Sequence, residues 1–344
     1  MVEITSATLA DGREILYFDD QPHPDRVLVD ARDIPTVAPA SEMRRDPLTG
    51  DWVAFAAHRM NRTFLPPANE NPLAPTREGQ LPTEIPSPSY DVVVFENRFP
   101  SFATAAEIEH PEEDNLLGMV PRLPARARCE VVCFTEDPAL SFKDLPESRI
   151  RTVIEAWAHR TAALSQIDGV QQVFPFENRG EEIGVTLQHP HGQIYAYDMV
   201  PPRARKELDA ARRHHSRTGR NLFGDILSRE LAEGSRIVAQ NATWVAFVPF
   251  AARWPVEVHL YPRTQVADLA ALDDAQRDGL AALYRDVLTR FDALYDAPLP
   301  YISAWQQAPA KADHPDRELA WLHVELFSIR RSADKLKYLA GTES

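Results

Sequence analysis

Two segments of this chain carry apolar residues at the spacing of an amphipathic helix. They span residues 146–165 and 274–295, and in both the apolar positions recur every three or four residues. The predicted faces consist of Ile150, Val153, Ile154, Trp157 and Leu164 in the first segment, and of Leu280, Leu283, Tyr284, Val287, Leu288, Phe291 and Leu294 in the second. We expect each helix to bury this face against a sheet.

Short apolar runs predict strands, and these runs recur in the same order around the two helices. They cover 92–95, 130–134, 170–176 and the segment around His189 in the first half, and 244–250, 256–261, 300–305 and 319–327 in the second. A hairpin is also predicted at 7–19. The repeated order predicts an internal duplication of one α+β unit with antiparallel sheets flanked by helices, and the alternative is two unrelated α+β stretches.

The duplication sets the expected domain boundaries. When the two halves are aligned, His323, Val324 and Glu325 take the places of His189, Pro190 and His191. The second unit has therefore lost the glycine and the nucleophile. We therefore expect an N-terminal extension at 1–43, a catalytic unit at 44–205 and a degenerate second unit at 206–344. A proline-rich loop at 66–88 has no apolar periodicity and is long for a compact domain.

Composition narrows the class of partner. The 344 residues include 37 Lys and Arg against 51 Asp and Glu, a formal net charge of −14, which argues against a nucleic-acid partner. The N-terminus lacks the pattern of a signal peptide, and the most apolar region, 244–262, is interrupted by prolines and charges. We expect a cytoplasmic protein without a membrane span, in which Cys129 and Cys133 are small buried hydrophobes.

The string His189-Pro190-His191-Gly192-Gln193 carries the chemistry. Residues two apart share a face of an extended segment, so both imidazoles and the Gln193 amide are expected on one surface of a strand through 185–197. Gly192 is expected to let backbone amides approach a ligand. A neutral imidazole is a competent nucleophile toward phosphorus. The alternative is that the histidines cap strand ends or bind a structural metal.

Several motifs together make the chain resemble one enzyme family. They are DPLTGDW at 46–52, HR at 58–59, FENRFP at 95–100, FENRG at 176–180, HPHGQ at 189–193 and RELAEGSR at 229–236. These strings resemble galactose-1-phosphate uridylyltransferases, the transferase branch of the histidine-triad superfamily, in which glutamine replaces the third histidine.

The resemblance implies a two-step exchange that belongs to galactose metabolism. His191 would take the uridylyl group from UDP-glucose, release glucose 1-phosphate and pass the nucleotide to galactose 1-phosphate. The backbone carbonyl of His189 would orient the His191 ring. Gln193 can donate a hydrogen bond but carries no proton to transfer, which favours transfer over hydrolysis. No cofactor is expected to be required for this chemistry.

The resemblance also assigns substrate contacts. These are Arg59 and Arg62 for phosphate, Asn97 near the nucleoside, Asn178, Gly184, Thr186 and Gln193 around the phosphates, and Lys337 with Tyr338 near the sugar phosphate. The planar guanidinium suits phosphate, although a solvated basic surface is the alternative for the arginines. Asparagines commonly cap turns, which is the alternative for Asn97 and Asn178.

Two metal sites of the family are altered here. Asn71, Ala74 and Pro138 stand at three of the four zinc positions and only His189 remains, so we expect the zinc site to be lost and replaced by hydrogen bonds and packing around Pro72 and Leu73. At the second site, Glu207, Gln306, His323 and Glu325 could hold a divalent ion, zinc or iron, or form a hydrogen-bonded polar cluster.

Other functions compatible with the motif remain open. One is an ADP-glucose or dinucleoside polyphosphate phosphorylase or adenylyltransferase of the same superfamily. Another is a sugar-nucleotide sensor, although the nucleophile and amide are both present, and a third is a metal-dependent hydrolase. The resemblance further implies a homodimer in which Arg59 serves the partner's active site and the loop at 66–88 takes part in the exchange.

Overall fold

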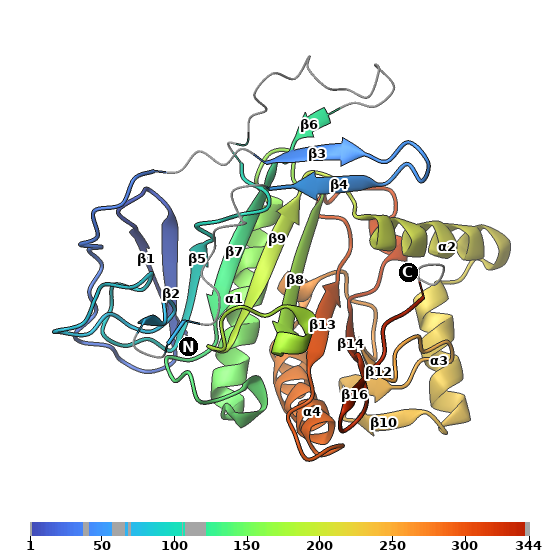
Figure 1. The fold of residues 1–344 in the computed structure, drawn as a ribbon. Coiled ribbons are helices and arrows are strands. Elements are labelled where there is room, and N and C mark those ends of the chain that lie inside the picture. Colours follow the sequence, from blue (N-terminus) through green and yellow to red (C-terminus); the bar gives the residue numbers. More distant parts are fainter. Residues whose placement is uncertain are drawn as a thin grey trace.

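The computed structural model describes residues 2–36, 41–56, 66–67, 70–104, 106 and 122–340. These residues form one eleven-stranded sheet in the order β1-β2-β5-β7-β9-β8-β13-β14-β12-β11-β10, in which all neighbours are antiparallel (Figure 1). The strands of the first half are β1 (Glu3–Thr8), β2 (Glu14–Asp19), β5 (Val92–Glu96), β7 (Ala127–Cys133), β8 (Gln172–Arg179) and β9 (His191–Tyr197). Those of the second half are β10 (Ile237–Gln240), β11 (Trp244–Phe247), β12 (Val256–Pro262), β13 (Tyr301–Gln306) and β14 (His323–Ser328).

The same order of elements occurs in both halves. The first half runs β5, β7, α1, β8, β9 along the chain, and the second runs β11, β12, α4, β13, β14. The sheet order is β5-β7-β9-β8 in one half and β11-β12-β14-β13 in the other, and the halves join where β8 pairs with β13. The predicted α+β class with antiparallel pairing is therefore confirmed, and the predicted hairpin at 7–19 forms β1 and β2.

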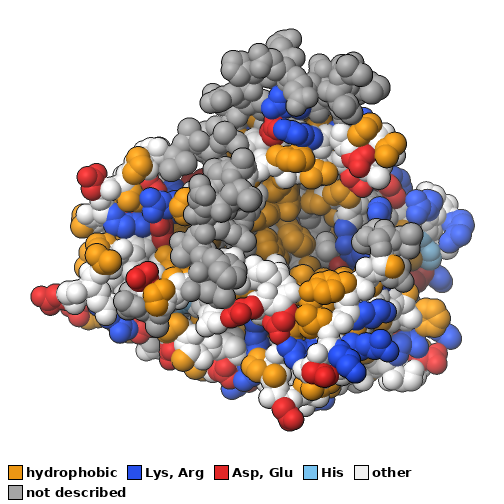
Figure 2. Space-filling view, in the orientation of Figure 1, with side chains coloured by type: hydrophobic (Ala, Val, Ile, Leu, Met, Phe, Trp, Pro, Cys, Tyr) orange, Lys and Arg blue, Asp and Glu red, His pale blue; other side chains and the backbone are white. Residues whose placement is uncertain are grey.

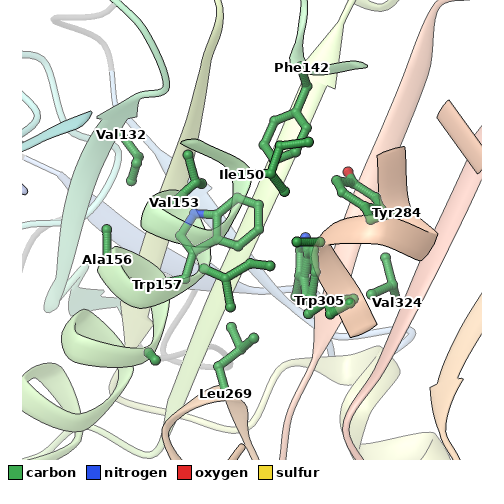
Figure 3. Packing of buried hydrophobic residues seen from close by; sticks show 14 of the residues in the cluster. Val132, Phe142, Ile150, Val153, Ala156, Trp157, Leu269, Tyr284, Trp305 and Val324 are labelled. Atoms are coloured by element: carbon green, nitrogen blue, oxygen red, sulfur yellow. The ribbon is translucent and has the colours of Figure 1, made fainter. Parts of the chain in front are cut away.

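Helices α1 (Glu147–Ser165) and α4 (Asp274–Asp292) lie against one face of the sheet. Trp157 of α1 and Trp305 of β13 are fully buried, and their ring centroids lie 4.8 Å apart (Figure 3). One continuous core therefore joins the two halves. The second helix ends at Asp292, earlier than predicted, and the Asp292 carboxylate accepts from the backbone N–H of Leu299 at 3.1 Å. The predicted burial of Leu294 is wrong, since this side chain is 51% exposed.

Separate elements cover parts of the opposite face of the sheet, among them the loop of Leu73, Ile85 and Tyr90 over β2, β5 and β7. Helices α2 (Pro202–Thr218) and α3 (Leu222–Glu233), which the apolar pattern did not predict, pack on β11 and β12. A three-stranded sheet of β4 (Trp52–Phe55), β3 (Glu42–Arg45) and β6 (Arg122–Pro124) packs over β7 and β9. The short strands β15 (Arg330–Ser332) and β16 (Lys335–Leu336) form a hairpin near the C-terminus. Figure 2 shows this face hollowed below the three-stranded sheet, with apolar side chains on the floor of the hollow.

Several predicted element boundaries differ from the structure. The strand expected through 185–197 begins only at His191, because the preceding residues follow a short 3₁₀ helix, Glu181–Ile183, flanked by Gly180 and Gly184 at positive φ. The strand expected at 319–327 begins at His323. Cys129 and Cys133 are buried, as predicted. Among the described residues, no helix combines the length and the apolar character that a membrane span requires.

Candidate active site

His191 is the first residue of β9, between β7 and β8. Its Nδ1 lies 2.7 Å from the backbone carbonyl oxygen of His189, as predicted from the resemblance. A carbonyl oxygen only accepts hydrogen bonds, so Nδ1 carries the proton and Nε2 of the neutral ring keeps its lone pair. Burial lowers the pKa of His191, which keeps the ring neutral. This is the tautomer that a nucleophile attacking through Nε2 needs.

A cavity of about 210 Å³ opens beside this ring. It is lined by Phe176, Asn178, Gly184, Val185, Thr186, His191, Gly192, Gln193 and Tyr195. The structure thus brings together four of the predicted substrate contacts with the predicted nucleophile. A neighbouring cavity of about 690 Å³ shares Asn178, Val185 and His191 with the first, so His191 faces a space large enough for a sugar nucleotide.

Gln193 presents its amide from the same face of β9 as His191. The Tyr195 hydroxyl donates to Gln193 Oε1 at 3.4 Å, so the amide nitrogen is the end that can donate to a phosphoryl oxygen. Tyr195 also packs edge-on against Phe176, with ring centroids 4.9 Å apart. Sequence reasoning did not include Tyr195 in the site, although the two-residue period of the strand places it on the face of Gln193.

Gly192 has a packing role in addition to the one expected. A Cβ at this position would lie 2.8 Å from Phe134 Cζ and 2.9 Å from the Phe176 carbonyl oxygen. Its φ is not positive, so the requirement is for space and not for an unusual backbone conformation. The glycine allows β9 to pack tightly between the core and β8. Gly192 also lines the smaller cavity, and the approach of a ligand to its backbone stays a prediction.

His189 does not present its ring beside His191 as the two-residue spacing predicts. It precedes β9, is 2% exposed, and turns its ring nitrogens toward Asn71, Tyr90 and Thr135. Burial lowers its pKa to about 4. His189 is therefore neutral at physiological pH and contributes to the site through its backbone carbonyl.

We expect acid to destabilise the folded chain through His189. Between about pH 6.5 and pH 4 the unfolded chain binds a proton on this ring that the folded chain does not bind, so the free energy of unfolding falls as the pH falls. The loss from this residue should reach about 3 kcal/mol at pH 4. Urea unfolding at several pH values should show a shallower loss for His189→Gln than for the wild type; equal losses would contradict the assignment.

The remaining predicted contacts lie elsewhere. Asn97 Oδ1 accepts from the Phe99 backbone N–H at 2.9 Å, the turn-capping role that was the alternative, and Asn97 lines neither cavity. The Tyr338 hydroxyl donates to the Glu182 carbonyl at 3.2 Å, which brings the segment with Lys337 to the rim of the larger cavity. Arg59 and Arg62 lie outside the described residues.

The larger cavity also contains charged residues that the sequence did not single out. Arg330 forms an ion pair with Glu182, and Arg179 donates to Asp292 at 2.8 Å. Both arginines line this cavity. Arg179 belongs to one of the motifs that carry the resemblance. Arg330 belongs to the second half of the chain, and nothing in the local sequence around it indicates that it lines a cavity with residues of the first half.

The second metal position holds a compact cluster. Ligand atoms of Glu207, His323 and Glu325 lie within 4.8 Å of one another. His323 Nδ1 donates to the Trp321 carbonyl at 2.8 Å, which leaves Nε2 as the acceptor, 3.9 Å from Glu207. Burial, with a smaller contribution from Glu325, raises the pKa of Glu207 to about 8.

Two further side chains contact the carboxylates of this cluster and would compete with a metal ion for them. Arg203 forms ion pairs with both Glu207 and Glu325. Gln306 Nε2 donates to Glu325 Oε2 at 3.3 Å, so this amide offers its nitrogen and not a ligand oxygen. Three of the four predicted ligands therefore fit a divalent ion, and Gln306 does not.

Comparison with known proteins identifies the family. The N-terminal domain model of galactose-1-phosphate uridyl transferase matches residues 32–201, and the C-terminal domain model matches 207–341. The chain belongs to this family. A galactose-1-phosphate uridylyltransferase of Streptomyces lividans is 46% identical over 309 residues, 89% of this chain and 80% of the relative. One from Thermotoga maritima is 34% identical, over 88% of this chain and 92% of the relative.

Solved structures agree with the family assignment. A uridylyltransferase structure matches with a TM-score of 0.74 and 32% identity, covering 88% of this chain and 91% of the other. An ADP-glucose phosphorylase from Arabidopsis thaliana matches with a TM-score of 0.64 and 21% identity, which shows a shared fold alone. The chain is thus an enzyme of a transferase family.

Proposed function

We propose that this enzyme exchanges uridylyl between UDP-glucose and galactose 1-phosphate through a covalent intermediate on His191. The observation that carries the proposal is the hydrogen bond from His191 Nδ1 to the His189 carbonyl, because it leaves the Nε2 lone pair as the nucleophile. The names of the relatives support galactose 1-phosphate as a substrate and uridylyl as the transferred group.

In the first step, His191 Nε2 attacks the α-phosphorus of UDP-glucose. The N–P bond forms as the bond between this phosphorus and the bridging oxygen breaks, and the electron pair leaves with glucose 1-phosphate. The ring retains its Nδ1 proton and becomes cationic, so the His189 carbonyl stabilises the intermediate. In the second step, a phosphate oxygen of galactose 1-phosphate attacks the same phosphorus and the imidazole leaves.

Gln193 supports transfer over hydrolysis. Glucose 1-phosphate leaves as a stabilised anion and needs no proton from an acid. The Gln193 amide can hold a phosphoryl oxygen, and it cannot act as a base toward water. The covalent intermediate should therefore persist until a sugar phosphate binds and reacts with it. Asn178 and Thr186 line the same cavity, which supports a role of their polar groups in binding the remaining phosphate oxygens.

Intact-protein mass spectrometry tests the proposal directly. Enzyme treated with a chelator and mixed with UDP-glucose alone should gain the mass of one uridylyl group. Addition of galactose 1-phosphate should remove this mass and yield UDP-galactose. No increment with UDP-glucose, but one with ADP-glucose, would move the assignment to the phosphorylase branch, which here has only the shared fold in its favour.

We further propose that the chain consists of two copies of a histidine-triad-like unit, the second degenerate, with boundaries at 1–43, 44–205 and 206–344. The identical strand order in the two halves supports the duplication. His323 and Glu325 lie on the same face of β14, as His191 and Gln193 do on β9. If limited proteolysis cleaves inside 206–344 earlier in the reaction than it cleaves between residues 201 and 207, the result would argue against these boundaries.

For the second site, we propose a divalent ion held by Glu207, His323 and Glu325, with Arg203 as the internal competitor. Such an ion would supply charge compensation and stability. His323 lies on β14, separated from β9 by β8 and β13, so no chemical step passes through the ion. Elemental analysis should find less metal in Glu207→Gln than in the wild type; equal content, or none in either, would favour the polar cluster.

We also propose a cytoplasmic homodimer that uses the exposed face of the three-stranded sheet. Val53, Phe55 and Leu123 of this sheet are 47%, 43% and 47% exposed, and Leu48 beside it is 93% exposed. An apolar group of this kind suits a protein interface. In this arrangement Arg59 would reach the partner's phosphate site. Sedimentation should show a dimer that Phe55→Asp weakens, and a wild-type monomer would exclude the proposal.

A further inference from the structure

The buried ring of His189 is held by hydrogen bonds where zinc-binding relatives place a metal. Nε2 lies 2.7 Å from the Thr135 carbonyl oxygen and 2.9 Å from the Tyr90 hydroxyl. Nδ1 lies 2.9 Å from Asn71 Nδ2. Asn71 occupies one of the three positions at which the zinc ligands are missing, and Ala74 and Pro138 offer no ligand at the other two.

The proton positions in this cluster follow from the partners. The Thr135 carbonyl can only accept, so His189 carries its proton on Nε2 and has its lone pair on Nδ1. The Asn71 amide nitrogen donates to that lone pair. The orientation of the amide is fixed because Asn71 Oδ1 accepts from the Leu73 backbone N–H at 3.0 Å. Both ring nitrogens are therefore satisfied, and neither is available to zinc.

Tyr90 completes the enclosure. Its hydroxyl lies 2.9 Å from the Leu73 carbonyl oxygen and 2.8 Å from the Thr135 carbonyl oxygen, and it is 1% exposed. It can donate to one carbonyl while its oxygen faces the Nε2–H of His189. The same hydroxyl thereby links the loop of Asn71 and Leu73, the end of β7 and the catalytic motif. The residues around His189 do not fit zinc, and their hydrogen bonds account for the whole ring.

We propose that Asn71 and Tyr90 are positioning residues of this active site, a hydrogen-bonded replacement for the zinc of related enzymes. These two side chains hold the ring of His189. The backbone carbonyl of the same residue accepts a hydrogen bond from His191 Nδ1 at 2.7 Å. Pro190 lies between the two histidines and restricts the backbone of His189. Its own carbonyl accepts from the Phe134 N–H at 3.2 Å. The hydrogen bonds to the ring thus anchor residue 189 itself, and a shift of its backbone after their loss would displace the carbonyl that orients the nucleophile.

The inference rests on the proposed function, because the positioned group is the proposed nucleophile. Asn71→Leu removes the donor to Nδ1, and Tyr90→Phe removes a single oxygen atom. We expect kcat for uridylyl transfer to fall about 10- to 100-fold in each variant, the range for groups that orient a ligating or catalytic histidine. The KM for UDP-glucose should stay within about twofold of the wild type, since neither residue lines the smaller cavity. Tyr17→Phe is the matched control, because Tyr17 is a fully buried tyrosine of the same cluster that does not bond to His189.

Asn71→Asp provides a readout that a purely structural role would not give. The introduced carboxylate cannot donate to a lone pair, and it favours a protonated His189 ring. Activity of this variant should be low at neutral pH and should recover as the pH falls toward 6, whereas Asn71→Leu should show no such recovery. Long-range ¹H–¹⁵N spectra should show the Nε2–H tautomer of His189 in the wild type and a different population in Asn71→Leu.

The outcomes separate the two proposals. Wild-type kcat in both Asn71→Leu and Tyr90→Phe would overturn the positioning role while leaving the proposed function intact. A wild type that transfers no uridylyl group would overturn the proposed function, and the NMR tautomer of His189 would still test the hydrogen-bond assignment. A His189 ring protonated on Nδ1 in the wild type would overturn the inference even if a variant failed to fold.

Discussion

Replacement of His191 by glycine is expected to lower the rate of uridylyl transfer by at least about 10⁴-fold, because no other described group in the cavity offers a comparable nucleophile. The fold should persist. His191 sits at the beginning of β9 and its side chain is only partly buried, so its removal opens the existing cavity more than it disturbs the core. Binding of UDP-glucose should be retained.

Three measurements check this expectation. Intact mass spectrometry should find no uridylyl adduct on His191→Gly, and a binding titration should still detect UDP-glucose. Added imidazole should restore part of the transfer, because the vacated space can hold the missing ring. The control is His215→Ala, an exposed histidine of α2, which should react normally. Adduct formation by His191→Gly at the wild-type rate would remove this residue from the nucleophile role.

The elements that the sequence predicted are those with a strong apolar period. α1 and α4 each bury a long apolar stripe, and the strand runs around them have matching apolar centres. α2 was not predicted because it buries only Ala204, Leu208 and Ala211, and two of these residues have small side chains. The strands β3, β4 and β6 escaped because each has only three or four residues, and much of each is exposed.

The site was predictable to the extent that it lies in one local string. His191 and Gln193 follow from the spacing on β9, and Asn178, Gly184 and Thr186 follow from the family resemblance. The partners of His189 depend on contacts between distant segments: Tyr90 precedes it by 99 residues and Asn71 by 118. No local pattern specifies such pairings. For the same reason, the two-residue spacing predicts the His189 ring beside His191, whereas tertiary hydrogen bonds turn this ring into the protein.

The packing at Gly192 leads to the second large expected effect, the loss of both stability and activity in Gly192→Ala. The new Cβ would approach Phe134 Cζ to 2.8 Å and the Phe176 carbonyl oxygen to 2.9 Å. Phe134 cannot yield easily, since its ring packs edge-on against Phe142, with centroids 4.9 Å apart. The carbonyl belongs to β8, which pairs with β9 at this point. We expect the free energy of unfolding to fall by about 1–3 kcal/mol, the usual cost of overpacking.

Activity should fall further than stability alone explains, because Gly192 lies between His191 and Gln193. A shift of about 1 Å in β9 would misalign the nucleophile and the amide together, and a displacement of that size can cost about 10²-fold in rate. Urea unfolding and kcat measured on the folded fraction separate the two effects. Gly219→Ala is the control for a new methyl group, since its φ is +70° and no heavy atom lies within 4 Å of the added Cβ. The free energy of unfolding of this control variant should fall by about 1 kcal/mol, and its activity should not change. A Gly192→Ala enzyme with wild-type kcat would show that β9 absorbs the methyl group without moving the site.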